Sequence, residues 1–188
     1  TVHQDRDGGV SVEALRLTGR GVLLTGDGGL SADGDLAFRT DLSIENTAVA
    51  PGTLGALRFD RGSVHAVASG TTQAPAVTAN LALDGVAGPR VRAQRLELLA
   101  KALVSPEESH SAGDPAFATV DLGGTVAGLK LDDPSLQAAL GEAPAFSGKA
   151  WLDAAKTRLT VESLSVDGRS VRLAGQGSFG FEDQRVAA

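Results

Sequence analysis

Apolar residues that stand two positions apart are the feature that most constrains how this chain can fold. The spacing recurs at Leu15–Leu17, Val77–Leu83, Leu159–Val161 and Leu164–Val166, with Arg, Thr or Ser among the residues in between. A period of two places alternate side chains on the same face of a β-strand. The sequence therefore predicts an all-β chain of short strands, each with one apolar face and one polar face.

Turn signals separate these segments. Asp27-Gly28, Asp84-Gly85 and Asp167-Gly168 are Asp-Gly pairs, which tight hairpins favour because Gly adopts a positive φ readily. The chain holds 24 Gly and 7 Pro, and only 4% of its 188 residues are aromatic. Leu, Val and Ala therefore carry most of the apolar surface, and successive strands are expected to pair as antiparallel hairpins.

An internal repeat links the two ends of the chain. Val12–Gly28 aligns without a gap on Val161–Gly177, and each copy contains a strand, a Gly-Arg turn, a second strand and further glycines. Strict alternation breaks at the same place in both copies, so we predict β-bulges at Ala14 and Ser163. The repeat indicates a stacked array in which each unit packs only against its neighbours, with chance similarity between simple β-sequences as the alternative.

One segment has the signals of a short helix rather than a strand. Asp133 suits the N-cap, Pro134 the first helical position and Gly141 the end, which predicts a helix near residues 133–140.

The region after residue 90 is harder to assign, because its leucines fit neither the helical nor the strand period. We favour a strand at Arg90–Leu99 and leave the residues up to Val104 open. The polar stretch Ser105–Pro115 predicts a mobile loop within residues 1–188, which otherwise form one segment of a repetitive array.

Composition and charge exclude several classes of protein. The net charge of −6 argues against nucleic acid, which needs clustered Lys and Arg. The absence of Cys excludes disulfides and thiolate metal sites. No run approaches the roughly 18 apolar residues of a membrane span. Because Thr1 is not preceded by Met, we expect the chain to be a piece of a longer protein.

No motif in the sequence predicts catalysis. Gly175–Gly180 matches G-x-G-x-x-G, but a dinucleotide site also needs a following helix, and these glycines stand in alternating β-sequence. His110 has acidic neighbours but lies in the predicted mobile loop, and His65 is expected on the outer face of a strand. We therefore predict no enzyme, no catalytic residue, no metal site and no cofactor.

The last third of the chain resembles a known family. The segment Leu131–Asp153, with its Asp-Pro helix ending in Leu-Gly, and the Gly-containing strands Leu159–Gly168 and Val171–Gly180 are similar to the inner repeats of the TamB/AsmA-like family. The likeness covers about sixty residues well and the rest loosely. The repeat copy at Val10–Leu30 has the strands without the helix.

The resemblance implies a fold, a place and a role. It implies an elongated, curled antiparallel sheet with a hydrophobic trough (a β-taco), in the periplasm of a Gram-negative envelope. The parent protein would be anchored in the inner membrane by a helix outside this chain. Such proteins move phospholipid between the two membranes and support outer-membrane protein assembly with a TamA-like barrel partner.

If the chain forms such a trough, its alternating aliphatic residues would line it and contact phospholipid acyl chains. Two alternatives remain open: a β-scaffold that chaperones or templates outer-membrane β-strands, and a structural β-solenoid without a ligand. The predicted lining residues are Val12, Leu15, Leu17, Val22, Leu24, Leu42, Ile44, Leu81, Leu83, Leu129, Leu131, Leu159, Val161, Leu164, Val166, Val171, Leu173, Phe179 and Phe181.

Overall fold

The computed structural model describes residues 1–4, 6–19, 21–48, 58–104, 117–153, 158–180 and 185–187. Within these residues the chain forms a series of strands and one short helix, α1 (Pro134–Leu140). The strands are β1 (Val2–Gln4), β2 (Val10–Gly19), β3 (Val22–Leu30), β4 (Asp35–Ala48), β5 (Arg58–Thr71), β6 (Pro75–Ala87), β7 (Val91–Val104), β8 (Phe117–Ala127), β9 (Lys130–Leu131), β10 (Ala145–Asp153), β11 (Arg158–Asp167), β12 (Arg172–Gly180) and β13 (Arg185–Ala187).

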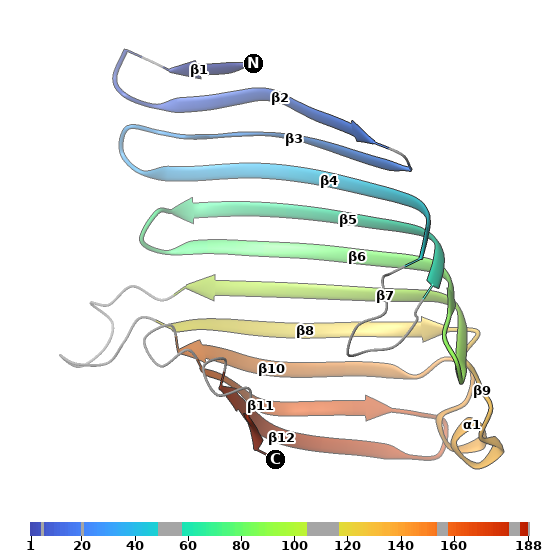
Figure 1. Ribbon diagram of the computed structural model, residues 1–188. Coiled ribbons are helices and arrows are strands. Elements are labelled where there is room, and N and C mark those ends of the chain that lie inside the picture. The colour runs from blue at the N-terminus through green and yellow to red at the C-terminus, as the bar shows by residue number, and fades with distance from the viewer. Residues whose placement is uncertain are drawn as a thin grey trace.

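The strands form one antiparallel sheet that follows the order of the chain (Figure 1). Each strand from β1 to β7 pairs with the next, β8 pairs with β10, and the order then continues through β11 and β12 to β13. The short β9 instead pairs with the start of β7, beside α1. The predicted all-β fold, a curled antiparallel sheet with one short helix, is confirmed.

The internal repeat corresponds to two hairpins with the same register. The register shifts between Val12 and Leu15 in β2–β3, and between Val161 and Leu164 in β11–β12, which confirms the predicted bulges at Ala14 and Ser163. The equivalent pairs are Val12–Gly28 and Val161–Gly177, Leu15–Gly26 and Leu164–Gly175, and Leu17–Leu24 and Val166–Leu173.

Helix α1 begins and ends as its sequence predicts. The Asp133 carboxylate accepts hydrogen bonds from the backbone N–H groups of Ser135, at 2.8 Å, and Leu136, at 3.1 Å. These bonds satisfy donors that a helix N-terminus otherwise leaves free. Gly141 ends the helix with φ 75°, a conformation that favours glycine.

The tip of the β11–β12 hairpin holds the other end of α1. The backbone N–H groups of Arg169 and Ser170 donate to the carbonyls of Leu140, at 3.1 Å, and Ala139, at 3.0 Å. Gly168 permits this approach, because a Cβ there would lie 2.7 Å from the Cα of Leu140. The helix therefore contacts the tip of this hairpin through backbone hydrogen bonds.

Strand β7 is longer than predicted, since it continues past Leu99 to Val104. Leu96 and Leu98 alternate with Leu99 and Leu103, so leucines occur on both faces of the strand. Because of these leucines on both faces, the period-two pattern of a strand could not be recognised in this part of the sequence. The predicted loop at 105–115 lies outside the described residues.

The sheet is a single layer with very little core (Figure 1). The chain exposes 12738 Å² to solvent, whereas a compact protein of its mass would expose about 8,400 Å². Among the described hydrophobic residues, only Ala93, Leu129 and Ala150 are buried. The apolar side chains of the strands therefore line a surface rather than fill an interior.

Candidate functional site

A continuous row of apolar residues crosses the sheet from β2 to β12. Residues that face each other on neighbouring strands project from the same side of a sheet, so the register defines which side chains lie together. The central row consists of Leu17, Leu24, Leu42, Val64, Leu81, Leu98, Gly124, Phe146, Val166 and Leu173.

Four further rows run parallel to the central row, one on one side of it and three on the other, with successive rows about two residues apart along the strands. Together with the central row they form what we call the apolar face. These rows contain no Asp, Glu, Lys or Arg, and Thr40 is their one polar side chain. They hold Val22, Ile44, Gly62, Leu83, Leu96 and Val126; Leu15, Gly26, Thr40, Ala66, Ala79, Ala100, Leu122, Gly148, Leu164 and Gly175; Val12, Gly28, Phe38, Ala68, Val77, Ala102, Val120, Ala150, Val161 and Gly177; and Val10, Leu30, Leu36, Gly70, Pro75, Val104, Ala118, Leu152 and Leu159.

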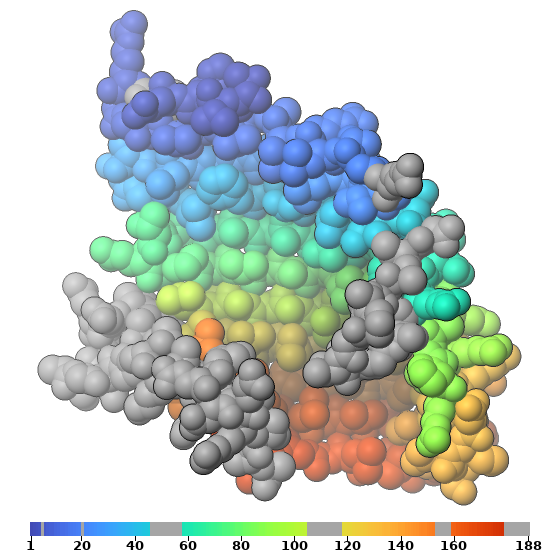
Figure 2. Space-filling model, viewed as in Figure 1, coloured from blue at the N-terminus to red at the C-terminus, as the bar shows by residue number. Residues whose placement is uncertain are grey.

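The apolar face is open to solvent, most of all near its two ends. Leu17 on β2 is 57% exposed and Leu173 on β12 is 53% exposed, and both belong to the central row. Residues in the middle, such as Leu81 and Leu98, are half-buried. Figure 2 shows one face of the molecule, over which the strands follow each other in chain order.

The structure brings most of the predicted lining residues together. Val12, Leu15, Leu17, Val22, Leu24, Leu42, Ile44, Leu81, Leu83, Leu159, Val161, Leu164, Val166 and Leu173 all lie on the apolar face. The backbone of Phe179 pairs with Leu159 in line with the outermost row. That these residues contact lipid stays a prediction.

The remaining predicted residues lie elsewhere. Leu129 is 7% exposed and stands between β8 and β9, and Leu131 pairs with Val91 at the edge where α1 docks. Val171 lies at the tip of the β11–β12 hairpin, where its carbonyl accepts a hydrogen bond from the N–H of Gly168. Phe181 lies outside the described residues.

Sequence analysis missed the part of the apolar face on β5, β7, β8 and β10, although it included Leu81 and Leu83 of β6. Val64, Leu96 and Leu98, together with small residues such as Ala66 and Ala100, belong to the part that was missed. The missing signal was alanine, since Leu96, Leu98, Ala100, Ala102 and Val104 alternate strictly once alanine is counted as apolar.

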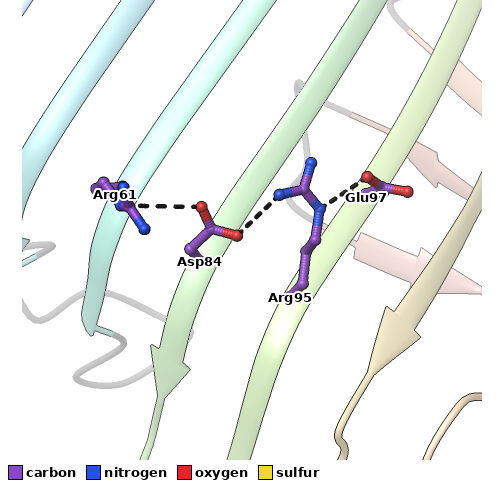
Figure 3. Close-up of polar contacts among 4 residues, drawn as sticks. All are labelled: Arg61, Asp84, Arg95 and Glu97. Atoms are coloured by element: carbon purple, nitrogen blue, oxygen red, sulfur yellow. Dashed lines mark hydrogen bonds and ion pairs between the residues drawn. The ribbon is translucent and has the colours of Figure 1, made fainter.

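The opposite face of the sheet is mostly polar, although Leu99 and Leu103 also project from it, and it carries the ion pairs drawn in Figure 3. Arg61 lies 4.0 Å from Asp84, and Arg95 donates to Asp84 at 3.1 Å and to Glu97 at 2.8 Å. The hydrogen bond and negative charge of Glu97, followed by the charge of Asp84, raise the pKa of Arg95. The groups are substantially exposed, so solvent screens these pairs and they add little to stability.

A shallow hollow of about 510 Å³ lies beside these ion pairs. Its lining includes Asn80, Arg95, Glu97 and His65, whose Nδ1 lies 2.6 Å from the carboxylate of Asp41. His65 is thus on the face opposite the apolar rows, as expected. Arg95 pairs with Asp84 and His65 with Asp41 across neighbouring strands, whereas Arg95 and Glu97 pair within β7. This arrangement suits a wet outer surface.

The described residues contain no group of three or more His, Asp or Glu side chains that could hold a metal ion. The glycines of Gly175–Gly180 lie within β12 and pair with β11. No helix in the described part is long and apolar enough to cross a membrane.

Comparison with known proteins found no match for this chain. No family model, no curated protein and no solved structure matches this chain. The apolar face is therefore the candidate site on physical grounds alone.

Proposed function

We propose that this chain is a periplasmic segment of an inner-membrane-anchored protein like those of the TamB/AsmA-like family. In this proposal it carries phospholipid along its apolar face between the inner and outer membranes and supports outer-membrane protein assembly. The observation that carries the proposal is the continuous, charge-free apolar face. The resemblance of residues 131–180 to the family's repeats supports the same conclusion.

The dimensions of the apolar face suit acyl chains. Strands in a sheet lie about 4.8 Å apart, so a row across ten strands is about 43 Å long. One leaflet of a bilayer core is about 15 Å thick, half of the full hydrocarbon thickness. Lipid tails could therefore lie along the rows one after another.

The energetics favour holding lipid tails without fixing them in place. Each methylene group removed from water contributes about 0.8 kcal/mol, and this term has no preferred direction. The apolar face has no charge that a tail would have to desolvate. A tail bound here can move from one strand to the next while it keeps a similar buried area, which is what a conduit requires.

The free edges of the sheet favour a second candidate, a scaffold for outer-membrane β-strands. Among the described residues, β1 pairs only with Val10–Val12 of β2, and β13 only with Ser178–Gly180 of β12. The remaining outer edges of β2 and β12 could accept an incoming strand by backbone hydrogen bonds. A partner protein of this kind would bind the edges rather than the apolar face.

Two adjacent leucines of β7 provide a matched test of lipid binding. Leu98 belongs to the central row, whereas Leu99 projects from the polar face and is 37% exposed. Protein purified without detergent is examined by native mass spectrometry, followed by lipid extraction. We expect phospholipid to accompany the wild type and Leu99→Asp and to be lost from Leu98→Asp, because only the latter places a charge among the lipid tails.

Circular dichroism is the control for folding, since both variants should keep a β-sheet spectrum. A wild-type protein that is free of lipid and takes up none when phospholipid is added would contradict the proposal. Equal lipid retention by the two variants would show that lipid binds somewhere other than the apolar face.

A further inference from the structure

The apolar face is large enough to form a stable interface between two proteins. The chain exposes 12738 Å², which is about 4,300 Å² more than a compact protein of its mass. Five rows two residues apart span about 27 Å along the strands, and ten strands span about 43 Å across them. The face therefore covers about 1,200 Å², and two copies in contact would bury about 2,300 Å², within the range of obligate homodimers.

The pattern of large and small side chains on the apolar face would allow two copies of this face to pack together. The central row is bulky, with leucines at Leu17, Leu24, Leu42 and Leu98, whereas the next row is mostly small, with Gly26, Ala66, Ala79 and Ala100 among its members. When two sheets pack about 10 Å apart, their side chains interdigitate. A two-fold axis would place the bulky row of each copy over the small row of its partner.

Electrostatics does not oppose such contact. The five rows carry no charged side chain, so pairing two apolar faces would bury no ion without a partner. The Arg61–Asp84–Arg95–Glu97 set lies on the opposite face and would stay in water.

We propose that, without lipid, two copies of this chain pack apolar face against apolar face as a symmetric homodimer. An interface of this type is isologous, with the same surface on both copies. The proposal goes beyond lipid carriage, since it holds whether or not lipid binds. Phospholipid and the second copy would compete for the same face, so each would weaken the binding of the other.

The first test measures the mass of delipidated protein by sedimentation across a dilution series. We expect the apparent mass to rise with concentration to twice the chain mass of 19.0 kDa. Leu98→Asp should abolish this doubling, whereas Leu99→Asp should keep it. A wild type that stays at the mass of one chain throughout would overturn the proposal.

The second test locates the interface with variants that preserve the fold. The chain has no cysteine, so Ala79→Cys on the apolar face and Thr78→Cys on the polar face each create a unique thiol. We expect maleimide to label Thr78→Cys at all concentrations and to label Ala79→Cys only on dilution. Association with Ala79→Cys fully labelled would overturn the proposal, since the copies would then pair through their edges.

A third test distinguishes the dimer from lipid carriage by adding a phosphatidylethanolamine with oleoyl chains to the delipidated protein. We expect lipid to reduce the mass from two chains to one chain with bound lipid, while Ala79→Cys stays protected at every concentration. A dimer that persists with no lipid uptake would support the interface and count against carriage. Lipid uptake by a protein that never dimerises would support lipid carriage and count against the interface.

Discussion

Gln137 attaches α1 to the sheet through both ends of its side-chain amide. Its Nε2 donates to the carbonyls of Leu129 and Gly141, each at 3.0 Å, and its Oε1 accepts from the N–H of Leu131 at 2.6 Å. We expect Gln137→Ala to lower the free energy of unfolding by about 2 kcal/mol, because partly buried backbone groups lose their partners. Urea denaturation followed by circular dichroism measures the change.

Ser135→Ala is the matched control on the same helix, since the Ser135 side chain is exposed and Asp133 caps its backbone N–H. It should leave the free energy of unfolding nearly unchanged. A loss as large for Ser135→Ala as for Gln137→Ala would contradict this account, because alanine is the strongest helix former and the loss could not then be assigned to the Gln137 amide.

Leu98 and Leu99 show what a sequence alone can and cannot tell at the level of a residue. Both are leucines in one strand, yet they lie on opposite faces of the sheet. Only the register with β6 and β8 decides which face joins the other apolar rows, and register depends on residues far away in the sequence. For this reason the predicted lining residues omitted Leu98 and the other apolar residues of β5, β7, β8 and β10.

The two repeated hairpins offer a comparison at the level of elements. A Cβ on Gly168 would lie 2.7 Å from the Cα of Leu140 in α1, whereas a Cβ on the equivalent Gly19 would meet nothing within 4 Å. We expect Gly168→Ala to lower the free energy of unfolding by about 1–3 kcal/mol through overpacking. Gly19→Ala should change it by less than about 0.5 kcal/mol. Urea denaturation of the two variants side by side tests this, and equal effects would contradict it.

Elements with local signals were predictable and the others were not. Asp133, Pro134 and Gly141 marked α1 because caps act within one turn. The bulges at Ala14 and Ser163 followed from a break in alternation that both copies share. The end of β7 was missed, because Leu99 and Leu103 on the polar face disturbed a pattern that is visible only once the pairing is known.

At the scale of the whole molecule, the open sheet should affect how denaturant acts on it. The slope of unfolding free energy against urea scales with the surface exposed on unfolding. Because the folded chain already exposes 12738 Å², the slope for monomeric protein should be about three quarters of that of a compact domain of this size. Urea titration of Leu98→Asp measures it, and a slope typical of a compact domain would mean that the apolar face is covered.

The alternation of strand direction restricts how a sheet of this kind can change in length. Removing β5 and β6 together would bring β4 beside β7, still antiparallel, with Leu42 and Leu98 adjacent on one face. Removing a single strand would set parallel neighbours side by side, and a short loop cannot join parallel strands. The sheet can therefore be lengthened or shortened only by whole hairpins, and its apolar surface grows or shrinks in steps of two strands.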